Sequence, residues 1–279
     1  MKKVLTIAAS DCSGGAGVQA DLKTMTAFGV YGMSALTFLT SQNTTGIQNV
    51  FDITNDFISD QIDSCCSDIL PDATKTGALF DTDKIETITE KIKYFQLKNI
   101  VVDPVMVCTA SGGITDCLLK PSAVNTMIKK LFPIADIITP NIPEAEVLFE
   151  NITKEKIKIN TKEKMEESAK IIAKSTKNGY VLLKGGHFNN CDDCLLYENN
   201  IIWLKGKKVN TKNTHGTGCT LSSAIACCLA LGFDMVESCK KAKEYVYMAI
   251  LNNPNIGKGN GPINHCLTLK NQGFIKILI

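Results

Sequence analysis

A short stretch around residue 215 places glycines next to a cysteine where a helix is expected to begin. His215-Gly216-Thr217-Gly218-Cys219 leads into an apolar segment with helical spacing that runs to Gly232. Glycines on both sides of Thr217 let several backbone N–H groups turn toward one point, and the helix adds the positive end of its dipole. The pattern indicates an anion-binding site; the alternative is a glycine-permitted turn without a ligand.

Cys219 stands in the first turn of this helix. The helix dipole favours a thiolate, so we expect the pKa of Cys219 to fall from the ~8.5 of a free thiol toward neutrality. Such a thiolate can accept a proton from a substrate. Two alternatives stay open: a small residue facing the core, or a nucleophile that forms a thioester, for which His215 is too close in sequence to be assigned as the base.

Oxygen ligands follow two of the expected strands. Asn141 and Glu144 lie in Thr139-Pro140-Asn141-Ile142-Pro143-Glu144, where the prolines stop the strand and stiffen the turn. An amide and a carboxylate at a fixed separation can share a hard cation, directly or through water. The alternative is a helix cap that needs no metal. Asp103, at the end of IVVDP, adds a second carboxylate or serves only as a turn residue.

Three further motifs are less specific. Lys184 ends a strand before two glycines, which suits a nucleotide phosphate or a solvated loop equally. The glycines at 14, 15 and 17 lack the G-x-G-x-x-G spacing of a dinucleotide loop, so an NAD site is not expected. Cys191 and Cys194 have C-x-x-C spacing without a second pair, which favours a loop over a zinc site. Together, an anion hole, carboxylates for Mg²⁺, a lysine and a proton acceptor indicate phosphoryl transfer to an alcohol.

Composition narrows the class of protein. A formal net charge of +2 offers no field for nucleic acid or anionic lipid. Twelve cysteines in 279 residues are too few for a disulfide scaffold, and several lie in apolar runs, so we expect reduced, mostly buried thiols. The apolar run after Met1 is too short for a signal peptide or a membrane span. We therefore expect a cytoplasmic enzyme that acts on small molecules.

Strand and helix patterns alternate along the chain, which predicts a largely parallel sheet with helices on both faces. Two apolar runs around Glu198-Asn199-Asn200 predict an antiparallel hairpin at one sheet edge. The expected strands are 4–9, 32–40, 73–78, 100–104, 137–139 and 180–184, and the expected helices are 18–28, 58–69, 83–95, 122–131, one starting at 144–148, 162–175 and the one after Gly216. We expect one domain over residues 1–279, with ligands at the carboxyl ends of the strands.

The motifs jointly resemble a known family over nearly the whole chain. The segments SDCSGGAGVQADLKT, TSQNTTGIQNV, VDPVMV, TPNIPEAEVL, LLKGGH, NTKNTHGTGC and GNGPINH are similar to those of the hydroxymethylpyrimidine/phosphomethylpyrimidine kinases of thiamine biosynthesis. These enzymes are ribokinase-like, so the resemblance implies an α/β three-layer sandwich, ATP and Mg²⁺ as cofactors, and a homodimer. It also implies two successive phosphorylations, first of the alcohol and then of its monophosphate.

The resemblance assigns roles to individual residues. Cys219 is implied as the base beside the acceptor hydroxymethyl group, with the backbone of Gly216, Thr217 and Gly218 around the transferring phosphoryl. The implied phosphate side is Asn141, Lys184 and Thr214, the implied metal ligands are Asp103 and Glu144, and the implied substrate side is Gln42, Ala9, Asp21 and Val107.

Gln42 matches a glutamine that pairs with the aminopyrimidine edge, because an amide offers a donor and an acceptor together. Ala9, Cys12 and Ala78 depart from residues common in the family at the expected substrate pocket, which bears on fine substrate preference. The chief rival is pyridoxal kinase, whose members share the cysteine turn but tend to differ at the position of Gln42. A rival from another class is a nucleotide-binding or thiol-sensing protein without turnover.

Overall fold

The alternating segments build the central sheet expected from the sequence. The computed structural model describes residues 1–106, 118–186, 188 and 190–267. Within them, nine strands form one sheet in the order β3-β2-β1-β4-β5-β6-β7-β8-β9. The strands are β1 (Lys3–Asp11), β2 (Tyr31–Asn43), β3 (Gly46–Asp52), β4 (Ala73–Thr76), β5 (Ile100–Val102), β6 (Ile137–Ile138), β7 (Val181–Leu183), β8 (Asp193–Tyr197) and β9 (Asn200–Leu204).

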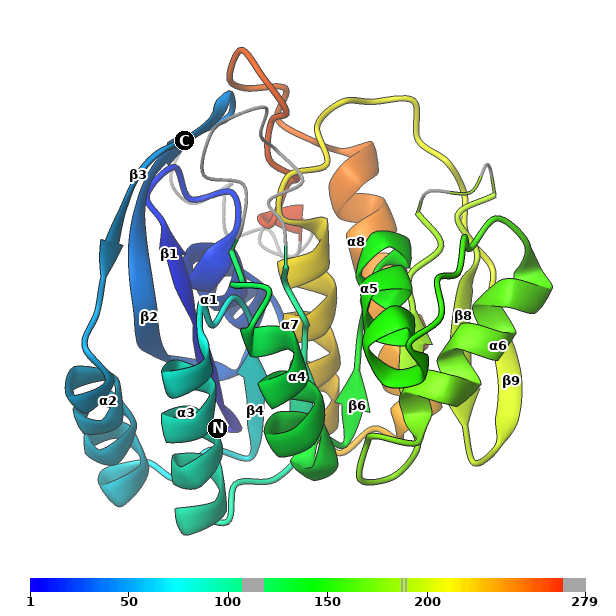
Figure 1. Cartoon of the computed structure of the whole chain (residues 1–279). Coiled ribbons are helices and arrows are strands. Elements are labelled where there is room, and N and C mark those ends of the chain that lie inside the picture. Colours follow the sequence, from blue (N-terminus) through cyan, green and yellow to red (C-terminus); the bar gives the residue numbers. More distant parts are fainter. Residues whose placement is uncertain (107–117, 187, 189, 268–279) are drawn as a thin grey trace.

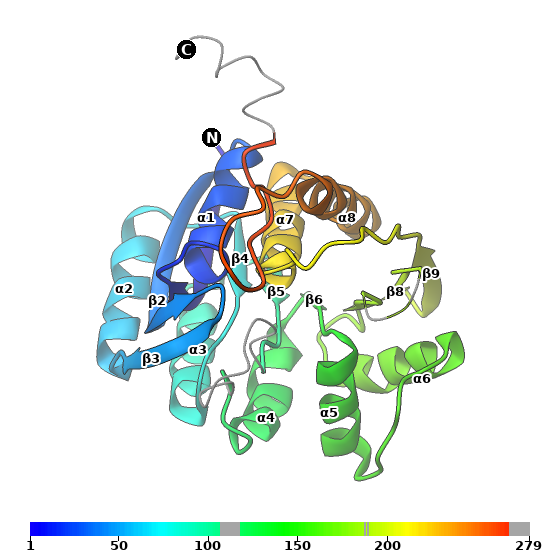
Figure 2. The same cartoon turned by 90° about the horizontal axis from the view of Figure 1, so that it is seen from above.

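Helices cover both faces of this sheet and make three layers (Figures 1 and 2). The helices are α1 (Gly17–Ala27), α2 (Asn55–Asp68), α3 (Thr82–Tyr94), α4 (Ala123–Thr126), α5 (Ile142–Thr153), α6 (Lys162–Ala173), α7 (Thr217–Leu231) and α8 (Met235–Leu251). One apolar core joins α2 to α6 with one face of the sheet, and a second joins α1, α7 and α8 with the other. The expected three-layer α/β sandwich is thereby confirmed.

Strand directions place the informative residues at one end of the molecule. β2, β1, β4, β5, β6 and β7 are mutually parallel, and β8–β9 is the predicted antiparallel hairpin at the edge. The carboxyl ends of the parallel strands therefore meet at the same side of the sheet, where Asp11 ends β1, and Asp103 and Lys184 directly follow β5 and β7. The register between β1 and β2 shifts between Ala8 and Ser10, beside this end.

Three elements differ from the sequence-based expectation. β3 adds an antiparallel strand at the opposite edge, where most of its side chains are partly or fully exposed and show no alternation. The segment expected as one helix over 122–131 is α4 followed by a π-helical stretch, Met127–Leu131. α8 was not among the expected helices, although Asp234 caps its start by accepting a hydrogen bond from the Glu237 N–H.

The described cysteines carry no disulfide bond. Cys66, Cys194, Cys227, Cys228 and Cys239 are buried, whereas Cys12 and Cys266 are exposed. The expected burial of most thiols therefore holds for five of the ten cysteines in the described residues. Among the described helices, none combines the length and the apolar character needed to cross a bilayer.

Candidate functional site

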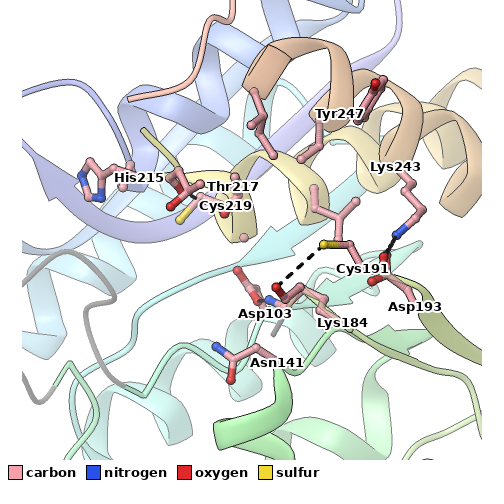
Figure 3. A pocket seen from close by; sticks show the side chains of 18 of the residues that line it. Asp103, Asn141, Lys184, Cys191, Asp193, His215, Thr217, Cys219, Lys243 and Tyr247 are labelled. Carbon is pink, nitrogen blue, oxygen red and sulfur yellow. Dashed lines mark hydrogen bonds and ion pairs between the residues drawn. The ribbon is translucent and has the colours of Figure 1, made fainter. Parts of the chain in front are cut away.

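A cavity of about 1000 Å³ opens at the carboxyl ends of the parallel strands. It brings together most of the residues singled out from the sequence: Ala9, Gln42, Asp103, Asn141, Glu144, Lys184, Thr214, Gly216, Thr217, Gly218 and Cys219 all line it. Figure 3 shows how the labelled side chains gather around it from different strands and from α7 and α8. Asp21 does not line the cavity, and Val107 and His187 lie outside the described residues.

The turn before α7 has the backbone of an anion hole. Gly216 is the N-cap in the left-handed conformation, with φ of 84°, and no side chain caps this helix terminus. A Cβ at this position would lie 1.8 Å from the carbonyl oxygen of Gly15, so the backbones approach too closely for any side chain. A Cβ on Gly218 would lie 3.3 Å from Lys184 Nζ. The positive end of α7 and the lysine cation therefore face the same space.

Cys219 lies where two helix N-termini meet. Its thiol is in the first turn of α7 and also faces the start of α1, where the Gly17 N–H donates a hydrogen bond to it. The expected depression of the thiol pKa toward neutrality is wrong. Burial raises the pKa of Cys219 to about 12, with Asp21 and Asp103 adding to the rise and Lys75 opposing it. Loss of hydration outweighs both helix dipoles.

Asp21 belongs to a buried ion pair below the cavity, which corrects its expected place beside the substrate. Its Oδ2 lies 2.8 Å from Lys75 Nζ, and both side chains are fully buried. Thr6 Oγ1 and Ser223 Oγ each donate a hydrogen bond of 2.6 Å to the Asp21 carboxylate. Burial acts to lower the pKa of Lys75, but Asp21, Cys219 and Asp103 outweigh it and raise the pKa. Sequence analysis missed Lys75, because a lysine inside a strand gives no sign of full burial.

Asp103 and Lys184 form a second ion pair, which lies in the cavity itself. Lys184 Nζ is 2.9 Å from Asp103 Oδ1, and Thr139 Oγ1 donates to the same oxygen at 3.2 Å. Ser222 Oγ donates to the other oxygen of Asp103 at 3.4 Å. Burial acts to lower the pKa of Lys184, yet Asp103 and Glu144 raise it overall. Lys184 is therefore held as a cation that can form an ion pair with a phosphate.

Asn141 and Glu144 form the helix cap that was one of the two expectations for them. Asn141 Oδ1 accepts from the Glu144 N–H at 2.9 Å, and Glu144 Oε2 accepts from the Asn141 N–H at 2.8 Å. Burial raises the pKa of Glu144 to about 7, with Asp103 adding to the rise and Lys184 opposing it. A nearby cation would stabilise the ionised Glu144 carboxylate and so lower its pKa.

No cluster of three His, Cys, Asp or Glu side chains suited to a metal occurs in the described parts of the chain. Mg²⁺, however, is commonly held by one or two carboxylates together with substrate phosphates. Asp103 and Glu144 are hard oxygen donors that both line the cavity, next to the anion hole. They fit a magnesium ion that arrives with a nucleotide.

Gln42 is buried at the end of the cavity formed by β1 and β2. Its side-chain amide lies 3.3 Å from His215 Nε2 and 3.1 Å from Thr40 Oγ1. Cys12 Sγ lies 3.2 Å from both the backbone N and O of Gln42. Ala9 and Ala78 line the same end, so the departures noted in the sequence border this part of the cavity.

Lysines gather at the opposite end of the cavity, which sequence analysis did not single out. Lys205, Lys207, Lys208 and Lys240 are exposed and line it. Lys243, from α8, instead pairs with Asp193 at 2.6 Å, and Asp193 also accepts from the Gly185 N–H at 2.8 Å (Figure 3). This basic end suits a polyphosphate. Three of these lysines lie together in the loop directly after β9, which was a local signal in the sequence, whereas the approach of Lys240 from α8 had none.

The C-x-x-C pair does not behave as a metal site. Cys191 is partly exposed at the cavity, whereas Cys194 is buried within β8. Burial raises the pKa of Cys194 to about 12, with Glu166 and Asp193 adding to the rise. The pair thus spans the loop before the hairpin and the start of β8, which agrees with its interpretation as the segment that leads into the hairpin.

Solved structures share the whole architecture. The ADP complex of pyridoxal kinase from Bacillus subtilis is 36% identical, with a TM-score of 0.86 over 97% of this chain and 99% of that chain. Phosphomethylpyrimidine kinase from Clostridium difficile 630 is 42% identical, with a TM-score of 0.76 over 90% of this chain and 100% of that chain. The fold and the site define a small-molecule kinase of the ribokinase-like class.

Sequence comparison narrows this class. The phosphomethylpyrimidine kinase family model matches residues 11–264. A hydroxymethylpyrimidine/phosphomethylpyrimidine kinase from Staphylococcus aureus strain MRSA252 is 38% identical over 276 residues, covering 98% of this chain and 96% of that protein. The chain belongs to the phosphomethylpyrimidine kinase family.

Proposed function

We infer that this chain phosphorylates 4-amino-5-hydroxymethyl-2-methylpyrimidine with ATP, first to the monophosphate and then to the pyrophosphate, in thiamine biosynthesis. Family membership supports the reaction. The observation that carries it within the structure is the position of Cys219, between an anion hole on one side and the polar end around Gln42 on the other. A hydroxymethyl group held near Gln42 would face the phosphoryl group across this thiol.

We assign the nucleotide to the basic end of the cavity. Lysines line that end, and Lys184 would lie beside the phosphates with the backbone of Gly216, Thr217 and Gly218 around the transferring group. Asp103 and Glu144 would hold Mg²⁺, which when bound neutralises charge on the β- and γ-phosphates. Donors fixed in advance around the phosphoryl group stabilise its charge in the transition state without reorganisation.

The reaction also requires the transfer of one proton, which a side chain of this chain accepts. In the first step, the substrate oxygen bonds to the γ-phosphorus as the bond from that phosphorus to the ADP oxygen breaks. The hydroxyl proton goes to the Cys219 sulfur, which must first be a thiolate. In the second step, the attacking atom is an oxygen of the monophosphate, which is already ionised near neutral pH. Cys219 is therefore needed mainly for the first step.

Pyridoxal phosphorylation is the second candidate, and one observation favours it. The pyridoxal kinase from Bacillus subtilis matches this fold with a TM-score of 0.86, above the 0.76 of the phosphomethylpyrimidine kinase from Clostridium difficile. Against it stands Gln42, whose amide at the cavity end can pair with both a ring nitrogen and an amino group of the pyrimidine.

The test is ATP consumption with Mg²⁺ and, separately, the hydroxymethylpyrimidine, its monophosphate and pyridoxal. We expect turnover on both pyrimidine species, with kcat/KM for pyridoxal lower by tenfold or more, about the worth of one lost hydrogen bond. A preference for pyridoxal would replace the pyrimidine assignment with the second candidate. ATP binding without turnover on any acceptor would instead indicate a nucleotide-binding protein.

We further propose a homodimer that buries the β2–β3 edge. Leu39 and Phe51 lie directly opposite each other on these strands, 36% and 68% exposed. Apolar cross-strand pairs left in water are typical of interfaces. Sedimentation velocity should give a dimer for the native chain and a monomer for Phe51→Glu. Tyr94→Glu, at a comparably exposed aromatic on α3, should leave the dimer intact; a dimer unaffected by Phe51→Glu would contradict the proposed interface.

We also propose that residues 1–279 act as one kinase unit and that the enzyme works in the cytoplasm. The unit is supported by the single sheet that runs through the described residues. The location is supported by the exposed free thiols of Cys12 and Cys266, because such thiols stay reduced in a reducing compartment.

A further inference from the structure

Two adjacent carboxylates, Asp192 and Asp193, stand at the start of β8, between the two cysteines of the C-x-x-C motif. Their side chains are almost fully buried, with 4% and 7% exposed. Lys162 Nζ, from α6, lies 2.8 Å from Asp192 Oδ2. Lys243 Nζ, from α8, lies 2.6 Å from Asp193 Oδ2 (Figure 3). Because successive side chains of an extended segment point to opposite faces of a sheet, each carboxylate is neutralised by a lysine from a different helix layer.

The other oxygens of the two carboxylates hold backbone beyond the end of the strand pairing. The pairing of β8 ends at the last residue of β7 on one side and at the last residue of β9 on the other. Just past these ends, the Gly185 N–H donates to Asp193 Oδ1 at 2.8 Å. The Gly206 N–H donates to Asp192 Oδ1 at 3.0 Å. Each side chain thus takes the place of a strand partner where the regular ladder has stopped.

The backbones around these two glycines approach too closely for a side chain. A Cβ on Gly185 would overlap the carbonyl oxygen of Asp192, and a Cβ on Gly206 would overlap that of Cys191. Lys243 Nζ also donates to the Cys191 carbonyl oxygen at 2.8 Å. The chain just before β8 is therefore packed directly against the loops on both of its sides.

Both glycines directly follow a lysine that lines the cavity. Lys184 precedes Gly185, and Lys205 precedes Gly206. The Lys184 cation is held by Asp103, at the far end of its side chain. The backbone after Lys184 and the cation of Lys184 are therefore held by different carboxylates.

We propose that Asp192 and Asp193 are positioning residues for the nucleotide, which hold the backbone after Lys184 and after Lys205 at a fixed separation across β8. This rests on the proposed function, in which the nucleotide occupies the basic end of the cavity. Lys243 acts through Asp193, because its cation is already paired with a buried carboxylate and a carbonyl oxygen. Burial raises the pKa of Asp193 and Lys243 opposes this rise, so loss of the lysine would favour neutralising the carboxylate that holds the loop.

The test is a double-mutant cycle between Asp193→Asn and Lys243→Gln. The readouts are Kd for ADP with Mg²⁺, from isothermal titration calorimetry, and KM for ATP. We expect each single change to raise both values about 5- to 10-fold, the worth of one hydrogen bond, with KM for the pyrimidine within twofold. Either orientation of the asparagine amide points an N–H at another donor, the Gly185 N–H or Lys243. In the double variant the asparagine accepts from Gly185 and donates to the glutamine, so most of the affinity should return.

The same variants separate positioning from direct contact with the phosphates. If Lys243 bound the nucleotide itself, Asp193→Asn would release its cation and tighten ADP binding, and the double variant would bind as weakly as Lys243→Gln alone. Either result would overturn the proposal. Lys241→Gln is the matched control, because Lys241 lies on the same helix, pairs with Glu237 at the surface and does not line the cavity. It should leave Kd for ADP unchanged.

Asp192→Asn tests the second carboxylate. We expect Kd for ADP to rise about threefold, less than for Asp193→Asn because Lys162 is 40% exposed and its ion pair is screened by water. An unchanged Kd for ADP in either aspartate variant would overturn the proposal. So would a parallel rise of KM for the pyrimidine, since the carboxylates would then be merely structural.

ADP binding requires no acceptor, so this test does not depend on which alcohol is phosphorylated. If the native chain bound no ADP, the nucleotide assignment in the proposed function would fail, and this proposal with it. If the native chain bound ADP and the single variants bound it equally well, the nucleotide assignment would stand and only the roles of Asp192 and Asp193 would be overturned.

Discussion

Cys219→Ala is expected to lower kcat for the hydroxymethylpyrimidine alcohol by about 10²- to 10⁴-fold, the usual contribution of a positioned base. The reaction on the monophosphate should fall by less than about tenfold, because its attacking oxygen carries no proton that must be removed. The measurement is steady-state ATP consumption on each acceptor separately, at saturating ATP. The expected signature is the difference between the two steps, not the loss of either alone.

A matched control lies on the same helix. Cys227→Ala removes a thiol from the fully buried side of α7, two turns beyond Cys219, and should change neither step by more than about twofold through the site. An equal loss in both steps for Cys219→Ala would indicate that the thiol packs or positions without accepting the proton. A first-step rate that survives the substitution would exclude Cys219 as the base.

The raised pKa of Cys219 gives this prediction a pH dependence. With a pKa of about 12 in the free enzyme, the thiolate fraction increases with every unit of pH across the working range. The free enzyme is the state that kcat/KM reports. The value of kcat/KM for the alcohol should therefore keep rising through pH 9, and Cys219→Ala should abolish the rise above pH 8. A plateau beginning near pH 7 would show that the thiol ionises near neutrality.

This high pKa bears on why the position is a cysteine. A neutral thiol places no fixed negative charge beside the monophosphate, which is itself the acceptor of the second step. We expect an aspartate at this position to repel that acceptor, while in the first step it would be a weaker base than the thiolate but one that is already ionised at neutral pH. If Cys219→Asp kept the second-step rate, this account of the cysteine would fail.

Sequence patterns predicted those parts of the site that depend on local structure. The turn at Gly216, the cap of Asn141 with Glu144, and the strand ends at Asp103 and Lys184 each follow from residues close together in the chain. Their meeting in one cavity follows from the rule that parallel strands end on the same side of a sheet. The fold and the side of the sheet that holds the cavity could therefore be predicted from the sequence.

What the sequence could not predict depends on burial and on distant contacts. The helix dipole at Cys219 was visible, but the loss of hydration that reverses its effect requires the packed structure. Asp21 lies in a helix whose start lines the cavity, yet its carboxylate points into the core because Lys75 from β4 balances its charge. α8 has apolar residues interrupted by lysines and glutamates, and its start is capped by Asp234, so capping would have been the better signal there.

Lys75→Met is expected to destabilise the chain by about 3–5 kcal/mol, because it leaves the Asp21 carboxylate buried without its cation. Lys75 Nζ lies 2.8 Å from Asp21 Oδ2, and both side chains are fully buried. Methionine preserves the length of the stem while removing the charge. Since whole domains are stable by about 5–15 kcal/mol, this single change should strongly lower the urea concentration at the midpoint of unfolding. It should also raise the pKa of Cys219, which Lys75 at present opposes.

The loss of stability should come from breaking the ion pair and not from removing the lysine side chain itself. Lys75→Met combined with Asp21→Asn removes both charges. The amide oxygen can accept from one of the Thr6 and Ser223 hydroxyls while the amide nitrogen donates to the other, so most of the lost stability should return. Lys158→Met provides the surface comparison, because Lys158 is 78% exposed in its pair with Glu146 and should cost less than about 1 kcal/mol. If Lys75→Met cost no more than Lys158→Met, water would have to reach Asp21, and the thiol above it would no longer owe its high pKa to a dry environment.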